Sequence, residues 1–134
     1  MALIVGGCLC GRVRYEVERD GAIVDYCHCD TCRRSTGGAT VAWMQVHPSR
    51  FRVTAGEAVA YASSEKMIRH FCSACGSQLY MTDAEGRSVG VTVGTLDDKD
   101  AVVPAAHGWD SARPSWLCLA DDLPRFAADP DYDN

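Results

Sequence analysis

The sequence predicts an all-β fold of short antiparallel sheets with minimal helix. Most of the chain divides into short segments that alternate apolar and polar residues or are rich in β-branched and aromatic residues. Clusters of Gly, Ser, Asp and Glu separate these segments at regular intervals, which favours antiparallel strands over β-α-β units. Seven of the eight cysteines also gather in three tight groups, a spacing typical of metal sites.

The first two clear strands follow from local patterning. Residues 11–17 alternate, with Val13, Tyr15 and Val17 on one face and charged residues on the other. Residues 40–47 are rich in β-forming residues, and a proline follows them directly. Both segments therefore fit strands of half-buried sheets.

Five further strands and one helix complete the expected fold. The strands are expected over residues 51–54, 59–62, 67–72, 78–82 and 88–94. Residues 30–35 are the best helical candidate, because Gly37 and Gly38 follow them and would end a helix.

Three cysteine motifs supply seven sulfurs in positions suited to metal binding. They are Cys8 and Cys10, then Cys27, Cys29 and Cys32, then Cys72 and Cys75. In a C-x-C on a strand both side chains leave on the same face, and a C-x-x-C turn points both thiolates at a common centre. Tetrahedral zinc binds four sulfurs at ~2.3 Å. Seven ligands therefore predict two zinc ions per chain, one in a closed four-sulfur site and one in a three-sulfur site with an open position, as in catalytic centres.

Disulfides, an iron–sulfur cluster and redox chemistry are the alternatives. The even number of cysteines would fit the disulfide framework of a short secreted protein. Cysteines two positions apart bridge each other only with strain, however, and a chain of this size can bury a core without disulfides. Redox C-x-x-C motifs usually stand singly in a β-α-β setting, which the sequence lacks.

Length and composition limit the remaining possibilities. The 134 residues with 47% hydrophobic content fit a single zinc-binding domain over 1–128, followed by an acidic tail over 129–134. The formal net charge of −5, which metal-bound thiolates make more negative, argues against nucleic acid as a partner. No apolar run is long enough to cross a bilayer, and residues 1–7 lack the features of a signal peptide. Cysteines that bind metal must stay reduced, so a cytoplasmic location is expected.

Spacing alone leaves the division of the seven cysteines open. Joining the first and third motifs would tie an N-terminal hairpin to the middle of the chain and add folding stability. The middle motif would then form a local, shallow site that is open on one side. This site is the candidate for chemistry.

Residues beside the middle motif have competing interpretations. His28 lies between two cysteines, so on a strand it points away from both sulfurs and is not expected to bind the metal. Arg33 and Arg34 are either ordinary surface charge or a binding site for an anionic substrate, since arginine binds carboxylates through two hydrogen bonds.

The remaining cysteine and the tryptophans are expected to have packing roles. Cys118 lies in an apolar stretch and reads as a buried structural thiol rather than a ligand. Trp43, Trp109 and Trp116 are expected in the core or in the wall of a pocket.

The cysteine motifs and their neighbours resemble the glutathione-dependent formaldehyde-activating enzyme family, which includes centromere protein V. The resemblance spans nearly the whole chain. The matching segments are Gly6-Gly7-Cys8-Leu9-Cys10-Gly11, Cys27-His28-Cys29-Asp30-Thr31-Cys32-Arg33, Phe71-Cys72-Ser73-Ala74-Cys75-Gly76, Pro114-Ser115-Trp116 and Leu123-Pro124-Arg125-Phe126.

This resemblance implies a β-tent fold, with two sheets around a structural zinc, and a second, catalytic zinc. The implied structural ligands are Cys8, Cys10, Cys72 and Cys75, and the implied catalytic site is Cys27, Cys29 and Cys32. The implied activity is that of a carbon–sulfur lyase run in the synthetic direction, S-(hydroxymethyl)glutathione synthase, which joins glutathione and formaldehyde. A small-molecule thiol such as glutathione is then the partner, with no nucleic acid or membrane.

The chemistry of three thiolates favours thiol capture over hydrolysis. Three sulfurs donate much charge to zinc and weaken it as a Lewis acid, whereas an incoming thiolate is itself the nucleophile that adds to an aldehyde. The alternative function is a non-catalytic zinc-binding thiol carrier or protein-interaction module.

Overall fold

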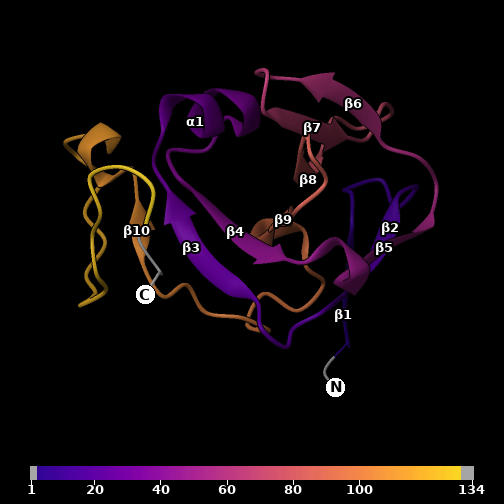
Figure 1. The fold of residues 1–134 in the computed structure, drawn as a ribbon, viewed down its shortest axis with the longest axis horizontal. Helices are drawn as coiled ribbons and strands as arrows, with labels where there is room; N and C mark the ends of the chain where they lie inside the picture. Colours follow the sequence, from indigo (N-terminus) through magenta and orange to yellow (C-terminus); the bar gives the residue numbers. More distant parts are fainter. Residues whose placement is uncertain (1–2, 131–134) are drawn as a thin grey trace.

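The computed structural model describes residues 3–130, which form two β-sheets and a single α-helix (Figure 1). The smaller sheet has the order β1-β2-β5, at Leu3–Gly7, Arg14–Glu18 and Phe51–Ala55. The larger sheet has the order β10-β3-β4-β9-β8-β7-β6. Its strands are His107–Gly108 (β10), Ile23–Cys27 (β3), Val41–Val46 (β4), Val89–Thr92 (β9), Gln78–Asp83 (β8), Met67–Phe71 (β7) and Val59–Ala62 (β6). Neighbouring strands are antiparallel apart from β10 and β3, which confirms the all-β class.

Short helices connect the strands. The helix α1 (Asp30–Thr36) follows β3, and Gly37 ends it with a left-handed φ of 77°. Three short 3-10 helices also lie between strands or after them: η1 (Pro48–Arg50), η2 (Val93–Thr95) and η3 (Asp110–Ala112). Among the described residues, no helix is long and apolar enough to span a membrane.

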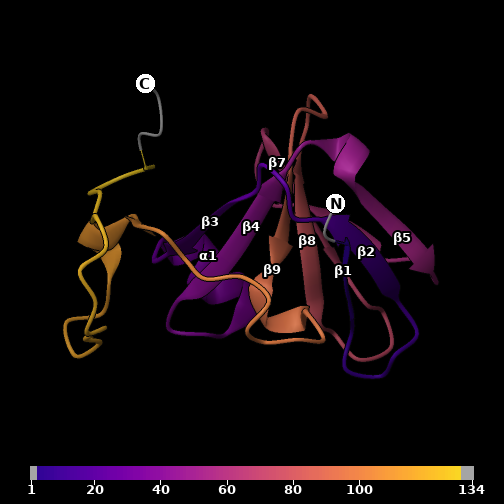
Figure 2. The ribbon, with the colours of Figure 1, turned by 90° about the horizontal axis from the view of Figure 1, so that it is seen from below.

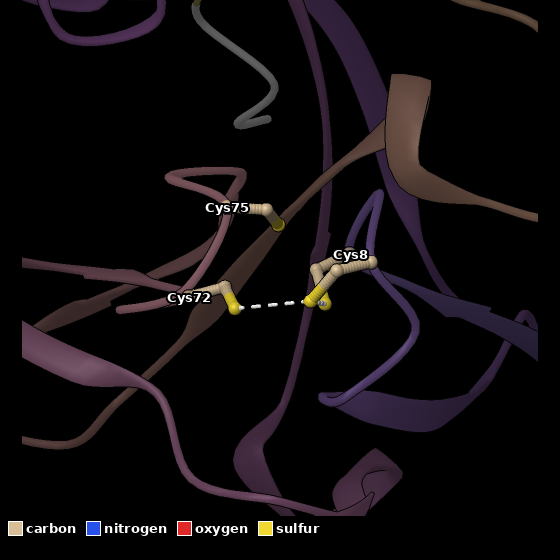
Figure 3. Close-up of side chains that lie close together, drawn as sticks. Cys8, Cys72 and Cys75 are labelled. Carbon is tan, nitrogen blue, oxygen red and sulfur yellow. Dashed lines mark hydrogen bonds between the residues drawn. The ribbon is translucent and has the colours of Figure 1, made fainter.

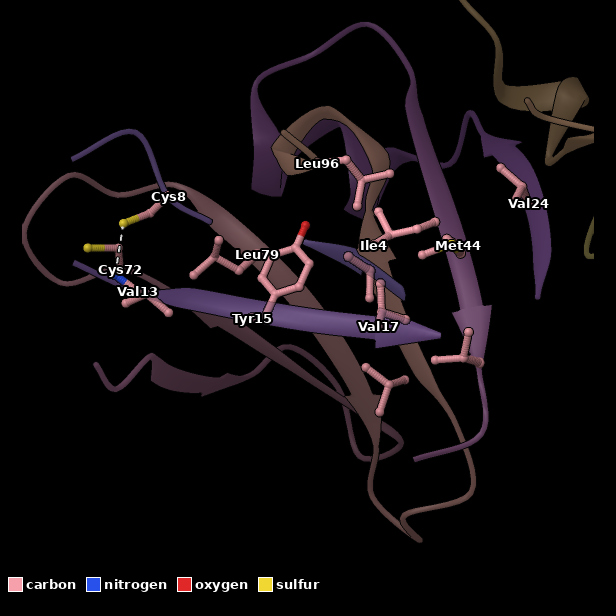
Figure 4. Close-up of a cluster of buried hydrophobic side chains, with 13 residues drawn as sticks. Ile4, Cys8, Val13, Tyr15, Val17, Val24, Met44, Cys72, Leu79 and Leu96 are labelled. Atoms are coloured by element: carbon pink, nitrogen blue, oxygen red, sulfur yellow. Dashed lines mark hydrogen bonds between the residues drawn. The ribbon is translucent and has the colours of Figure 1, made fainter. Parts of the chain in front are cut away.

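The two sheets stand side by side, and the C-terminal segment lies at the far end of the molecule. Figures 1 and 2 both show β1, β2 and β5 on one side of the larger sheet and the segment after β10 beyond β3. Apolar residues from both sheets meet in one core (Figure 4). Tyr15 and Val17 from β2, Met44 from β4 and Leu79 from β8 are at most 1% exposed there. Each buried apolar side chain contributes about 1.5–3 kcal/mol to folding, so this core holds the sheets together.

Gly6 in β1 allows a close approach of backbone and side chain in this core. A Cβ atom at this position would lie 2.4 Å from the Oη atom of Tyr15 and 2.5 Å from the carbonyl oxygen of Thr95. The Tyr15 hydroxyl also makes a 2.7 Å hydrogen bond to the hydroxyl of Thr95. Only glycine fits between them without a shift of the strand.

Most predicted elements agree with the structure to within a few residues. The predicted helix is α1, and the strand predicted over 59–62 is β6. The strand predicted over 11–17 begins later, at Arg14, because residues 8–13 form the turn that carries the first cysteine pair. The strands β1, β3 and β10 were not predicted. Of the predicted acidic tail, residues 131–134 lie outside the described part of the chain, and the carboxylate of Asp129 accepts a 2.8 Å hydrogen bond from Nε1 of Trp109.

Candidate metal centres and the hollows beside them

Four cysteine sulfurs meet where the two sheets adjoin. Cys8 and Cys10 follow β1 of the smaller sheet, and Cys72 and Cys75 follow β7 of the larger sheet. All four Sγ atoms lie within 4.8 Å of one another, and Figure 3 shows three of these side chains turned toward a common centre. We call these four residues the four-sulfur group.

The spacing of these sulfurs fits a tetrahedral metal ion. The Sγ atoms of Cys8 and Cys10 are 3.6 Å apart, and those of Cys10 and Cys72 are 3.7 Å apart. A tetrahedron with metal–sulfur bonds of ~2.3 Å has sulfur–sulfur edges of about 3.8 Å. Hydrogen bonds from the Ser77 hydroxyl and backbone lower the pKa of the Cys75 thiol to about 5, which favours the thiolate that a metal requires. The donor set therefore fits a thiophilic metal such as zinc.

A second set of three sulfurs forms around the start of α1. Cys27 ends β3, Cys29 caps the helix, and Cys32 lies buried in its first turn. The three Sγ atoms lie within 4.8 Å of one another. The Cys29 sulfur accepts a 3.3 Å hydrogen bond from the backbone N–H of Cys32. We call these residues the three-sulfur group.

The surroundings of the three-sulfur group favour one anionic sulfur at the helix terminus. Hydrogen bonds from the thiols of Cys27 and Cys32, with backbone N–H groups of the first turn, lower the pKa of Cys29 to about 2. The same contacts raise the pKa of Cys27. Trp43 and Val41 pack against Cys32, so one side of the group is covered by apolar residues. The group is thus shielded on one side, and all three of its sulfurs come from six consecutive residues.

His28 lies apart from the sulfurs, as expected from its place between Cys27 and Cys29. It is fully buried, and its Nε2 atom is 2.9 Å from Nδ1 of His107. Nε2 of His107 lies 3.0 Å from the carboxylate of Asp121. With that carboxylate accepting from His107, the Nδ1 atom of His107 accepts in turn from His28. The segment after β10 is thereby fastened to the loop that carries the three-sulfur group.

The same histidines and Asp110 form a third cluster of metal-binding residue types. Ligand atoms of His28, His107 and Asp110 lie within 4.8 Å of one another. The carboxylate of Asp110, however, accepts hydrogen bonds from Arg125 at 3.0 Å and Arg113 at 3.3 Å. Two guanidinium groups oppose a metal cation, and the imidazoles already bond to each other, so we assign this cluster to hydrogen bonding.

Two of the hollows around α1 bear on the three-sulfur group. One, of about 520 Å³, is bordered by the three sulfurs, Arg69, Met81 and Trp109 among others. The other, of about 530 Å³, lies between α1 and β7 and reaches the turn of the four-sulfur group at Gly76. Its lining residues are Thr31, Arg34, Ser35, Tyr61, Ser63, Arg69, Phe71, Gly76 and Gln78. Arg69 borders both hollows, and we call the second one the arginine hollow.

The two consecutive arginines have different surroundings. Arg34 lines the arginine hollow, in line with the hypothesis of an anion-binding role. Arg33 lies 3.5 Å from the exposed carboxylate of Asp30, in line with the hypothesis of surface charge.

The expectation that Cys118 is a buried thiol is wrong. Cys118 is exposed, because residues 114–124 form no helix or strand and lie outside the core. Trp116 is 72% exposed and thus belongs neither to the core nor to a pocket wall. Trp43 is buried as expected, and Trp109 borders the hollow beside the three-sulfur group.

Comparison with known proteins identifies the family. The family described as glutathione-dependent formaldehyde-activating enzyme matches residues 3–112. This chain belongs to that family. A Halomonas elongata protein, provisionally named a glutathione-dependent formaldehyde-activating enzyme, is 26% identical over an alignment of 126 positions that covers 86% of this chain and 80% of the relative. A crystal structure of a Rhodobacter sphaeroides protein is 25% identical with a TM-score of 0.62, and covers 92% of this chain and 100% of its own.

In this member of the glutathione-dependent formaldehyde-activating enzyme family, both sulfur groups fall inside the matched region, whereas Asp121 lies beyond it.

Sequence reasoning missed Arg69, His107 and Gln78 as residues of the site. The amide of Gln78 borders the arginine hollow with its polar atoms buried and, within residues 3–130, unpartnered. A basic residue three positions before Cys72 is a weak signal for Arg69, and no local signal indicates the other two.

Proposed function

We propose that this chain is a zinc-dependent carbon–sulfur lyase that joins glutathione to formaldehyde, as S-(hydroxymethyl)glutathione synthase does. The observation that carries the proposal is the contrast between the two sulfur groups. One brings four sulfurs together and completes a tetrahedron, and the other brings three and borders a hollow. Family membership and the name of the Halomonas elongata relative support the choice of substrates.

The two sulfur groups have separate roles in this proposal. The four-sulfur group holds a structural zinc that ties the smaller sheet to the larger one. The three-sulfur group holds the second zinc, giving two zinc ions per chain, with Cys27, Cys29 and Cys32 in the catalytic role. Zinc with an open position binds an incoming thiol as its thiolate and so keeps the nucleophile ionised near neutral pH.

The residues of the chain then position the substrate. Arg34 and Arg69 both line the arginine hollow, where the guanidinium of Arg34 suits a carboxylate of glutathione. The glutathione sulfur attacks the carbonyl carbon of formaldehyde, one carbon–sulfur bond forms, and the thiol proton ends on the new hydroxyl oxygen. Trp109 borders the hollow beside the sulfurs and limits the access of water.

A rate measurement with matched cysteine variants tests this proposal. NMR exchange spectroscopy on glutathione and formaldehyde gives the rate of adduct formation above the spontaneous rate. We expect the wild-type protein to accelerate adduct formation, Cys29→Ser to lose the acceleration while staying folded, and Cys118→Ser to keep it. The last variant is the control, because its sulfur is exposed and outside both groups.

The outcomes separate the enzyme from its alternative. Saturable glutathione binding without any acceleration would support a thiol carrier instead. Acceleration that survives Cys29→Ser would refute the role of the three-sulfur group. The proposal also requires a reducing compartment such as the cytoplasm, because oxidised thiols cannot bind the metal.

A further inference from the structure

Arg69 in β7 is a buried cation without a carboxylate. It is 6% exposed, and none of the ion pairs formed among residues 3–130 includes it. By contrast, the exposed or half-buried Arg14, Arg33 and Arg52 each pair with a carboxylate. An unpaired buried charge is costly, so a guanidinium in this position needs an anionic neighbour.

The contacts of Arg69 point its charge at the three-sulfur group. Its Nε atom donates to the hydroxyl of Ser63 at 3.0 Å, and Nη1 donates to the hydroxyl of Ser35 at 3.1 Å. Its Nη2 atom lies 3.9 Å from the sulfur of Cys32, and the guanidinium carbon is 5.9 Å from the ring centroid of Trp43. Both serines and the tryptophan are neutral. The only anionic group among these contacts is the Cys32 sulfur in its thiolate form.

Ser35 adds to the rigidity of this arrangement. Its hydroxyl accepts from Arg69 and donates to the backbone carbonyl of Cys32 at 3.2 Å. The guanidinium is therefore fixed to the first turn of α1, both through the Cys32 sulfur and through the Cys32 backbone. A group that is held in place in advance stabilises a neighbouring charge without further ordering cost.

We infer that Arg69 is the counter-charge of the three-sulfur group and acts as a positioning residue for its metal and for the incoming thiolate. This inference rests on the proposed function, in which three thiolates hold a divalent ion. Three thiolates and one such ion carry a net charge of −1, and a fourth thiolate raises it to −2. The positive charge of the buried guanidinium reduces the net negative charge, to 0 with three thiolates and to −1 with four. It therefore favours both the metal-loaded centre and the entry of an anionic fourth ligand.

The location of Arg69 agrees with this role. Its side chain borders the hollow beside the sulfurs and the arginine hollow at the same time. A thiol whose body occupies the arginine hollow therefore lies against a residue that also borders the hollow of the three sulfurs. The ordinary alternative is a structural arginine that only joins β7 to α1 through the two serines.

Metal affinity distinguishes the two roles without any activity measurement. We would titrate the reduced apoprotein with Co²⁺ in competition with a chelator and follow the sulfur-to-cobalt charge-transfer absorption. In Arg69→Met, we expect the weaker of the two metal sites to lose roughly 10- to 100-fold in affinity, as for other residues that contact metal ligands. The four-sulfur group should keep its affinity, and the far-UV circular dichroism should stay unchanged.

Three variants make the test specific. Arg69→Lys keeps the charge and should recover part of the affinity. Arg33→Met removes a charge directly next to Cys32 in sequence, but the Arg33 side chain pairs outward with Asp30, so this variant should bind Co²⁺ as the wild-type protein does. If Arg69→Met fails to fold, Ser35→Ala removes one hydrogen bond that holds the guanidinium, and we expect a several-fold loss at the same site.

Two results would overturn the inference alone. One is a folded Arg69→Met protein that binds Co²⁺ at both sites as tightly as the wild-type protein does. If Arg69→Met does not fold, the same result in Ser35→Ala would overturn the inference. The other is an Arg69→Lys variant no better than Arg69→Met, because charge would then not be the cause. A wild-type protein that binds a single metal ion, at the four-sulfur group, would refute the proposed function and this inference together.

Discussion

Replacing Gly6 by alanine should destabilise the junction between the two sheets. The added methyl group would lie 2.4 Å from the Tyr15 hydroxyl oxygen and 2.5 Å from the Thr95 carbonyl oxygen, both far inside van der Waals contact. Tyr15 is 1% exposed and cannot swing into solvent, and the Thr95 oxygen belongs to the backbone. The strand β1 must therefore shift.

The expected cost follows from these contacts. Overpacking of a core costs about 1–3 kcal/mol, and losing the Tyr15–Thr95 hydrogen bond adds about 1 kcal/mol. Together they lower the free energy of unfolding by about 2–4 kcal/mol, which corresponds to a midpoint lower by roughly 10 °C for a domain of this size. Because β1 leads directly into Cys8 and Cys10, the shift should also weaken metal binding at the four-sulfur group.

Thermal unfolding followed by far-UV circular dichroism, under reducing conditions with zinc present, measures this cost. Gly94→Ala is the matched control, since no atom lies within 4 Å of the Cβ atom it would add. An unfolding midpoint for Gly6→Ala within 1 °C of the control would refute the reasoning.

Three further predictions concern the cysteines and one ion pair. A chelator should remove one metal ion while the circular dichroism stays that of the folded protein. It should remove the second ion only as the protein unfolds, because the four-sulfur group joins distant segments of the chain. Release of both ions in one step would contradict this prediction. Cys118→Ala should keep both metal ions and the wild-type stability, since its thiol is exposed; elemental analysis of the purified variant checks it. The Arg14 guanidinium holds the pKa of Asp97 below its ordinary value of 3.8, so the pair stabilises the fold above that pH and loses its effect as the pH falls through the lowered pKa. The difference in unfolding midpoint between wild type and Asp97→Asn should accordingly vanish in acid, and a difference that grows there would contradict the assignment.

Local patterns in the sequence were sufficient for much of the fold. The strands β4, β6, β7 and β8 follow runs of β-forming residues, and α1 ends at the predicted glycine. The strand β1 was missed because its sequence, Leu-Ile-Val-Gly-Gly, does not alternate. The two-residue strand β10 owes its existence to pairing with β3, which is distant in sequence and leaves no local pattern.

The candidate site, like the fold, could be predicted only in part from the sequence. The three-sulfur group lies within six residues, so its proximity could be read directly from the spacing. The four-sulfur group needed the resemblance to a family, because spacing does not say which motif meets which. Arg69 lies 37 positions from Cys32 and contacts it only through the packing of β7 on α1. Cys118 was misread because apolar neighbours indicate burial only where a sheet or helix covers them.

The distance along the chain between the sulfurs has a consequence for biosynthesis. The three-sulfur group is complete as soon as Cys32 has emerged from the ribosome, whereas the four-sulfur group waits for Cys75, 43 residues later. At typical rates of synthesis this interval lasts roughly 2–9 seconds. During that time Cys8 and Cys10 are exposed thiols without their partners, while the middle motif can already bind a metal ion. The proposed catalytic centre is therefore the first that a nascent chain can load with a metal ion. The proposed structural centre can bind its metal ion only later.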